Sequence, residues 1–347
     1  MSHPAAPPRT VGREKSSILV VGPAWVGDMV MAQSLFIRLK QLHPDAEIDV
    51  LAPKWSLPLL ARMPEVREGV EMPLGHGELG LCVRRRLGHA LRQKNYHRAI
   101  ILPRSFKAAL VPWFANIPHR TGFKGELRYG LINDIRPLDK SLLTQTVQRF
   151  VALGEDQAPA VVPDVPSPAM TVDENNRQRI INALGLSVDQ PVIGMMPGAE
   201  YGPAKQWPPE YYAELARKLG EQGYASWVFG SAKEQPLGDQ IVSAGGDLAV
   251  NLCGRTQLAD VVDLLSLCKS TVTNDSGLMH VAGAVGTKVI AIYGSSSPLF
   301  TPPLGDKQEV VWLNIDCAPC FERECPFGHY NCLKQIEVQR ILDLALA

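Results

Sequence analysis

The sequence predicts an α/β protein made of two doubly wound, Rossmann-like domains that face each other across a cleft. Three observations support this fold class: continuous apolar segments alternate with amphipathic helices, a proline-rich stretch interrupts the alternation, and the alternation then restarts. Apolar segments without polar alternation are typical of parallel strands that are covered by helices on both faces. A length of 347 residues accommodates two such domains.

The first half contains three apolar segments that we interpret as parallel strands. They are 18–21, 48–51 and 99–102. Between the first two, apolar residues recur at helical spacing from Met29 to Leu42, which predicts a βαβ unit. We therefore expect a loose tail over residues 1–16 and an N-terminal domain over residues 17–165.

A stretch rich in proline and alanine, residues 157–168, is interpreted as an interdomain linker. The strands expected after it are 192–196, 225–229, 271–273 and 289–293. Helices are expected over 209–222, over 258–268 and from Ser276 onward. These elements predict a C-terminal domain over residues 170–335, followed by a closing helix over 336–347. Because parallel sheets bind ligands beyond the carboxyl ends of their strands, the cleft between the domains is the expected site.

The overall charge is balanced, with 35 basic and 35 acidic side chains, which argues against a nucleic-acid-binding protein. The balance is uneven along the chain, because residues 76–149 hold 14 Lys and Arg against 4 Asp and Glu. This excess of ten basic side chains fits either a solvated basic face or an anionic substrate or membrane surface.

No apolar run reaches the length of a membrane-spanning helix, and residues 1–15 lack the apolar core of a signal peptide. We therefore expect a cytoplasmic protein whose cysteines are mostly reduced. Four cysteines cluster near the C-terminus: Cys317, Cys320, Cys325 and Cys332. The first pair has zinc-ligand spacing, but the later gaps fit no standard zinc finger. A structural zinc and a set of reduced thiols both fit, and the second is favoured.

The residues suited to chemistry lie in loops that directly follow predicted strands. In the loop at 22–29, Asp28 stands where a helix begins. It is either an ordinary acid stabilised by the helix dipole or a base that takes a proton from an acceptor hydroxyl. A helix N-terminus favours the ionised carboxylate, so we expect it to weaken Asp28 as a base.

The loops of the second half are suited to a phosphate. Lys205 lies in a turn fixed by glycines and prolines, and its point charge suits a diphosphate. Asp275 and Ser276 are good helix N-caps, and Gly277 lets a ligand approach the backbone at a helix N-terminus. His280 would face the same side, one turn further on. Each loop singly is also explained as an ordinary capped helix.

Two further loops of the second half also directly follow predicted strands. In residues 230–234, Glu234 or Lys233 could contact a ribose or phosphate, although the start of a surface helix is the favoured interpretation. Residues 294–298 could complete a phosphate cradle. Together with Asp28, the loops suggest a nucleotide-diphosphate donor that faces an acceptor.

Several of these segments resemble the lipopolysaccharide heptosyltransferases of glycosyltransferase family 9. The matching segments are GPAWVGDM at 22–29, MPLGHG at 72–77, SFK at 105–107, IPHRTG at 117–122, RYGL at 128–131, residues 197–208 and TNDSGLMHVA at 273–282. The similarity runs in unbroken order from about residue 18 to residue 303. The cysteine-rich C-terminal segment lies outside it.

The resemblance implies a GT-B fold and an inverting glycosyltransferase that uses no cofactor or metal. The donor would be ADP-heptose, and the acceptor would be the first heptose of the anionic lipopolysaccharide core on Kdo2-lipid A. Asp28 matches the proposed general base of the family. The donor-binding residues that it implies are Gly198, Glu200, Lys205, Glu234, Asn274, Asp275, Ser276, Gly277 and His280. Charge and position suggest Trp25, Lys107, Arg120 and Arg128 as acceptor contacts.

A lipid acceptor would also explain the basic segment and predicts a peripheral enzyme on the inner leaflet of the inner membrane. Two alternatives remain open at this level. One is a GT-B transferase that uses another nucleotide sugar, and the other is a two-lobed small-molecule-binding protein.

Overall fold

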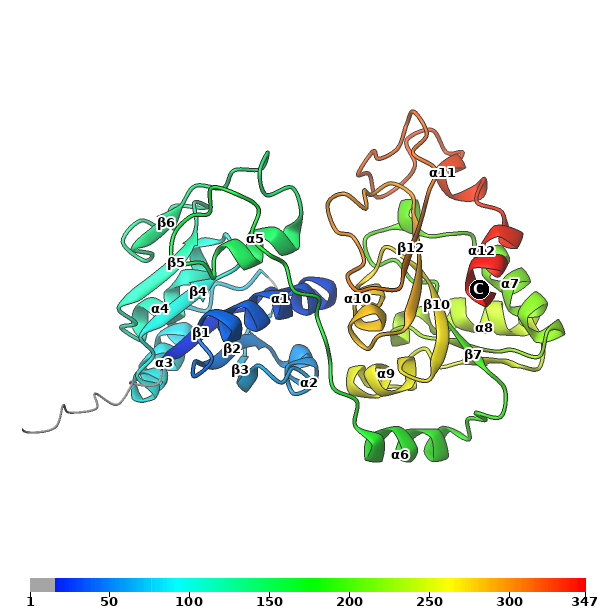
Figure 1. The fold of residues 1–347 in the computed structure, drawn as a ribbon, viewed down its shortest axis with the longest axis horizontal. Coiled ribbons are helices and arrows are strands. Elements are labelled where there is room, and N and C mark those ends of the chain that lie inside the picture. Colours follow the sequence, from blue (N-terminus) through cyan, green and yellow to red (C-terminus); the bar gives the residue numbers. More distant parts are fainter. Residues whose placement is uncertain (1–15, 76) are drawn as a thin grey trace, which may run out of the picture.

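The computed structural model describes residues 16–75 and 77–347 and contains two six-stranded sheets, one in each half of the chain (Figure 1). All strand pairs within both sheets are parallel. The predicted pair of doubly wound domains is therefore confirmed. Apart from Ser16, the tail predicted over residues 1–16 lies outside the described residues.

The first sheet has the order β3-β2-β1-β4-β5-β6. Its strands are β1 (Ser17–Val21), β2 (Glu47–Pro53), β3 (Val66–Met72), β4 (Arg98–Ile101), β5 (His119–Phe123) and β6 (Asp134–Arg136). Strand β1 is buried along its whole length because β2 and β4 pair with it on either side. The carboxyl ends of these central strands lie together, since Val21 pairs with both Leu51 and Ile101.

Helices cover both faces of this sheet (Figure 1). They are α1 (Val26–Leu42), α2 (Leu57–Leu60), α3 (Leu81–Leu91), α4 (Leu110–Phe114) and α5 (Thr146–Ala152). Short 3-10 turns, η1 (Lys54–Ser56), η2 (Arg92–Lys94) and η3 (Phe106–Ala109), lie in the connections. Helix α1 begins directly after β1 and packs against α5. This places the N-terminus of α1 at the carboxyl edge of the sheet.

The second sheet has the order β12-β11-β10-β7-β8-β9. Its strands are β7 (Val192–Met196), β8 (Ala225–Val228), β9 (Ala249–Asn251), β10 (Cys268–Asn274), β11 (Lys288–Tyr293) and β12 (Gln308–Trp312). Its helices are α7 (Pro209–Glu221), α8 (Gln235–Gly245), α9 (Leu258–Leu265) and α10 (Gly277–Ala284), with the short turns η4 (Pro203–Lys205) and η5 (Ala232–Glu234). Helix α9 ends before the predicted residue 268, because Cys268 already begins β10.

The chain crosses between the halves once after α5 and then forms α6 (Glu174–Leu184), which packs on α9 (Figure 1). The C-terminal segment ends in α11 (Asn331–Lys334) and α12 (Val338–Leu346). Helix α12 packs against α7 of the second half. Within the described residues, no helix is long and apolar enough to span a bilayer.

The two halves meet where the N-termini of α1 and α10 approach each other (Figure 1). A methyl group on Gly277 would lie 2.8 Å from Cβ of Val26 and 3.2 Å from the backbone nitrogen of Gly27. Polar contacts secure the same interface: Arg62 donates to the buried carboxylate of Asp263 at 2.6 Å. The side chain of Gln33 forms hydrogen bonds with both the carbonyl and the N–H of Ala169.

Because Gly277 has no room for a side chain, we expect Gly277→Ala to lower the free energy of unfolding by about 1–3 kcal/mol, as overpacking does. Gly220 in α7 is the matched control, since a methyl group there meets no atom within 4 Å. Gly220→Ala should raise that free energy by roughly 0.5–1 kcal/mol. Chemical denaturation measures the free energy of unfolding of both variants, and small-angle X-ray scattering measures the dimensions of the folded protein. Unchanged stability and unchanged dimensions for Gly277→Ala would contradict a tight contact between the helix ends.

Candidate active site

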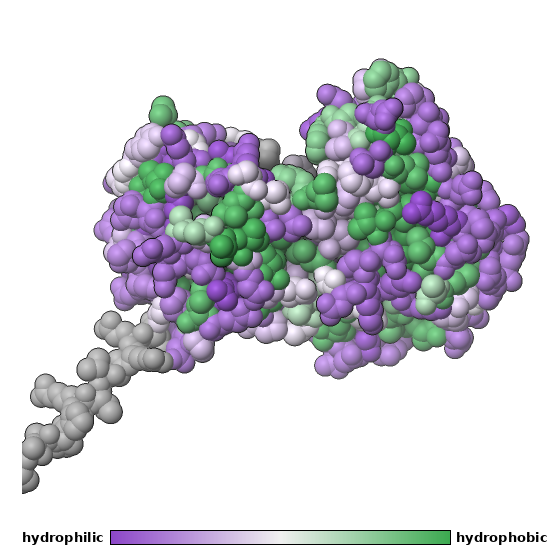
Figure 2. All heavy atoms as spheres, turned by 45° about the horizontal axis from the view of Figure 1, so that its top comes forward, coloured by the Kyte–Doolittle hydropathy of each residue, from purple (hydrophilic) through white to green (hydrophobic). Residues whose placement is uncertain are grey.

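A cavity of about 810 Å³ lies between the two halves, and Figure 2 shows the depression that separates the lobes. Its volume is typical of sites that enclose a small ligand. The lining from the first half includes Trp25, Asp28 and Trp55. The lining from the second half includes Gly198, Glu200, Tyr201, Lys205, Glu234, Asp275, Ser276, Gly277, His280, Thr301 and Arg323. Most of these residues follow strands β1, β7, β8, β10 and β11, so the carboxyl edges of both sheets face this space.

Asp28 occupies the first turn of α1 and faces the cavity. Burial raises the pKa of its carboxyl to about 6, and the nearby charge of Asp275 adds to the increase. The expectation of a weakened base is therefore not met, because burial and the charge of Asp275 both raise the pKa of this carboxyl. A carboxyl with this pKa is ionised at neutral pH and is still basic enough to accept a proton.

Lys205 and Asp275 form an ion pair across the second half of the cavity. Nζ of Lys205 donates to Oδ2 of Asp275 at 2.5 Å, and both side chains are largely buried. The ammonium group also lies 5.0 Å from the ring centre of Tyr201. These two contacts fix the position of the Lys205 ammonium group in the cavity, where it can face an anionic ligand.

Ser276 is the N-cap of α10, but its side chain makes no capping hydrogen bond. Its hydroxyl lies 3.3 Å from that of Thr273 instead. The N–H groups at the start of α10 therefore donate no hydrogen bond to the side chain of this cap, and Ser276 and Gly277 both line the cavity. Such a helix end attracts a phosphate.

His280 lies one turn further along α10 and is buried. Burial lowers the pKa of its imidazole to about 4; the charge of Asp275 raises the pKa and that of Lys205 lowers it. The ring is therefore neutral at physiological pH. It packs against Gly27, where a methyl group would lie 2.7 Å from Cδ2. Nδ1 of His280 has no hydrogen-bond partner among the described residues.

Glu234 and Glu200 both line the cavity, but they are held differently. The carboxylate of Glu234 accepts the N–H of Ser231 at 2.6 Å and lies directly against Gly198. A side chain at Gly198 would collide with it. Glu200 is exposed and lies 3.6 Å from Nζ of Lys233.

Asn274 corrects an expectation, because it lies behind the cavity wall and is fully buried. Its amide nitrogen donates to the carbonyl oxygens of Pro197 at 2.7 Å and Gly198 at 3.3 Å. Its side-chain oxygen accepts from the backbone N–H of Trp207 at 3.0 Å. Asn274 therefore ties two loops together and does not face a ligand.

Of the four expected acceptor contacts, the cavity includes Trp25 alone. Lys107 lies in η3 beyond the carboxyl end of β4, outside the lining. Arg120 belongs to the first residues of β5, at the opposite edge of the sheet, and donates to the carbonyl of Leu131 at 2.6 Å. Arg128 is 2% exposed and donates to the carbonyl of Pro103 at 2.7 Å. Arg120 and Arg128 thus support the backbone outside the cavity lining, and their contact with an acceptor stays a prediction.

The lining also includes residues that the sequence analysis did not single out, among them Trp55, Tyr201 and Arg323. Arg323 comes from the cysteine-rich segment, which lies outside the motifs that carried the sequence argument. The seven cysteines are all free. In the ranges 16–75 and 77–347, the structure contains no group of three His, Cys, Asp or Glu side chains arranged to hold a metal ion.

We expect Asp28→Asn to stabilise the protein at neutral pH. The pKa of Asp28 is higher in the folded protein than in the unfolded chain, so its ionisation above pH 6 lowers stability. The difference between the folded and unfolded pKa of Asp28 corresponds to at most about 3 kcal/mol in the free energy of unfolding. The gain should be largest above pH 7 and should shrink as the pH falls from 6 towards 4. Thermal unfolding over this pH range measures it, and a gain independent of pH would contradict the assignment.

The family model for glycosyltransferase family 9 (heptosyltransferase) matches residues 84–331. The lipopolysaccharide heptosyltransferase 2 of Salmonella typhimurium strain LT2 is 49% identical over 335 residues, covering 94% of this chain and 96% of the relative. The lipooligosaccharide heptosyltransferase 2 of Haemophilus influenzae is 48% identical over 310 residues, covering 86% of this chain and 88% of the relative.

Solved structures agree with the sequence relatives. The E. coli ADP-heptose lipopolysaccharide heptosyltransferase II superposes with a TM-score of 0.84 at 46% identity, covering 95% of this chain and 98% of the other. The E. coli heptosyltransferase WaaC with ADP shares the fold, with a TM-score of 0.69 at 17% identity, covering 95% of this chain and 99% of the other. The GT-B architecture is thus confirmed, and the chain belongs to glycosyltransferase family 9, the heptosyltransferase family.

Proposed function

We propose that this enzyme transfers L-glycero-D-manno-heptose from ADP-heptose to the first heptose of the lipopolysaccharide inner core, with inversion at the anomeric carbon. One observation carries the proposal: a basic carboxylate, Asp28, shares a cavity with an anion-binding wall from the other half of the protein. The names of the relatives supply the sugar and the acceptor.

The second half is suited to the donor. Lys205, the N-terminus of α10 and the loops after β7 and β8 surround the position where we place the diphosphate. These groups oppose the negative charge that develops on the departing ADP. Glu234, which is fixed by its bond to Ser231, is placed to accept hydrogen bonds from a ribose.

The chemical step follows from the position of Asp28. The oxygen of the acceptor hydroxyl attacks the anomeric carbon from the face opposite the diphosphate. The bond from that carbon to the phosphate oxygen breaks, and its electron pair leaves with ADP. The hydroxyl proton passes to the carboxylate of Asp28.

The acceptor would enter along the first half of the protein, where Trp25 and Trp55 line the cavity. The excess of basic side chains over residues 76–149 favours an anionic, lipid-anchored acceptor at a membrane surface. We infer a peripheral enzyme on the inner leaflet of the inner membrane. A GT-B transferase with another nucleotide sugar is the second candidate, because the charged groups of the cavity suit the phosphates that all nucleotide sugars share.

The transfer assay tests the reaction. Purified protein with ADP-heptose and heptosyl-Kdo2-lipid A should give a product heavier by one heptose. Asp28→Asn should lower kcat by about a hundredfold or more, with ADP affinity nearly unchanged. Because the ionised carboxylate is the base, kcat/KM of the unaltered enzyme should fall as the pH drops below about 6. Full activity of Asp28→Asn would exclude it as the base, and tight UDP or GDP binding without ADP binding would favour the second candidate.

We also expect Lys205→Ala to weaken ADP binding by about tenfold or more, measured by calorimetry. The change removes a cation and leaves the buried carboxylate of Asp275 unpaired beside the diphosphate. Lys218→Ala on the outer face of α7 is the control and should leave ADP binding unaltered. Unaltered ADP affinity in Lys205→Ala would remove this residue from the donor site.

A further inference from the structure

We infer that Arg323 forms a second phosphate-binding subsite at the rim of the cavity, together with Tyr201. This inference rests on the proposed function and adds a binding residue from the cysteine-rich segment. The residue has no counterpart in the motifs that identified the site from sequence. Its ligand is a phosphoryl group of the substrates, and the donor diphosphate is the favoured source.

The position of Arg323 is the first argument. Its side chain lines the main cavity. The guanidinium carbon lies 5.2 Å from the ring centre of Tyr201, and Nζ of Lys205 lies 5.0 Å from the same ring centre. Two cations that line the same cavity thus both contact Tyr201, which is a suitable arrangement for an anion with more than one charge.

The backbone around Arg323 is firmly attached to the donor loop, so the side chain has a fixed base. Its carbonyl accepts the N–H of Ala204 at 3.0 Å. The hydroxyl of Tyr201 donates to the carbonyl of Phe321 at 2.6 Å. Gly202 has a φ of +151°, and a methyl group there would lie 2.5 Å from the carbonyl oxygen of Arg323. The close approach of these two segments thus depends on glycine.

The charge of the cavity is the second argument. Among the described residues, four carboxylates line it, and the lysine and arginine that face them are Lys205 and Arg323. Lys205 is already paired with Asp275. Within the same part of the chain, the guanidinium of Arg323 has a cation–π contact but no hydrogen bond or ion pair. Its planar set of N–H donors is therefore available to a phosphate, which arginine binds in a bidentate manner.

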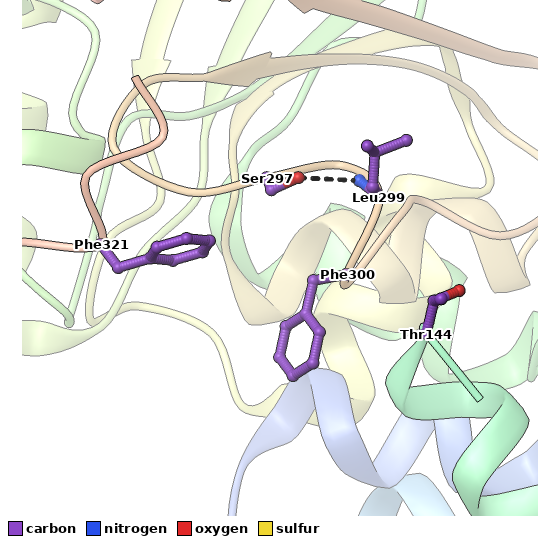
Figure 3. A pocket seen from close by; sticks show the side chains of 5 residues that line it. All are labelled: Thr144, Ser297, Leu299, Phe300 and Phe321. Atoms are coloured by element: carbon purple, nitrogen blue, oxygen red, sulfur yellow. Dashed lines mark hydrogen bonds between the residues drawn. The ribbon is translucent and has the colours of Figure 1, made fainter. Parts of the chain in front are cut away.

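Two phosphates could reach this position. The backbone of Arg323 is bonded to Ala204, the chain neighbour of Lys205, and both cationic side chains contact Tyr201, which favours the donor diphosphate. A smaller cavity of about 430 Å³ is lined by Leu299, Phe300 and Phe321, among others (Figure 3). Phe300 and Phe321 lie within two residues of Thr301 and Arg323, which line the main cavity. A phosphate on an acceptor that extends between the two cavities would therefore also meet the guanidinium.

The experiment compares Arg323→Ala and Arg323→Lys with the unaltered enzyme, and Arg340→Ala on the exposed face of α12 is the control. Calorimetry with ADP and with AMP measures the donor arm. Arg323→Ala should bind ADP about tenfold or more weakly and should lose less affinity for AMP. Arg323→Lys should recover part of the loss in affinity, since lysine keeps the positive charge but lacks the planar guanidinium that binds a phosphate in a bidentate manner.

The second arm measures KM for phosphorylated and for dephosphorylated core acceptor. A rise for the phosphorylated acceptor alone, with unchanged ADP affinity, would assign the subsite to the acceptor phosphate. If Arg323→Ala changes neither ADP affinity nor either KM while thermal unfolding stays normal, the inference is overturned. An unaltered enzyme that binds no ADP would instead overturn the proposed function, and this inference with it.

Discussion

The close contact between the N-termini of α1 and α10 determines the rest of the site. Gly27 and Gly277 leave no space for side chains between the helices. Each helix begins directly after a central strand, so the contact joins the carboxyl edges of the two sheets. Asp28 from one helix and Asp275, which precedes the other, thereby enter one cavity. Two positive helix ends also meet there, which favours a ligand with a compact negative charge.

Burial at this contact sets the protonation of the groups around it. It raises the pKa of Asp28 to about 6 and lowers that of His280 to about 4, so one side chain becomes a better base and the other stays neutral. The Lys205–Asp275 pair lies in the same region and keeps a paired cation in the cavity wall of the second half. The same desolvation that makes Asp28 basic lowers stability, as is common at catalytic positions.

The loops of the site depend on residues that do not face the ligand. Asn274 joins the loop after β10 to the loop after β7 through its buried amide. The cysteine-rich segment adds a second layer, because the backbone carbonyls of Phe321 and Arg323 accept hydrogen bonds from Tyr201 and Ala204 in the loop after β7. This segment therefore contributes to the cavity although its cysteines are all free.

The sequence by itself determined the fold class, the central strands and the loops around Asp28, Lys205 and Asp275. These follow from local patterns: apolar runs, helical spacing and capping residues at strand ends. Edge strands such as β3 and β6 were missed, because half-exposed edges lack a continuous apolar pattern. Only the tertiary structure decided that Asn274 and Arg128 are buried supports, that Arg323 reaches the cavity, and that Asp28 is basic. Each of these depends on contacts between segments far apart in the chain, and such contacts leave no local signal in the order of the residues.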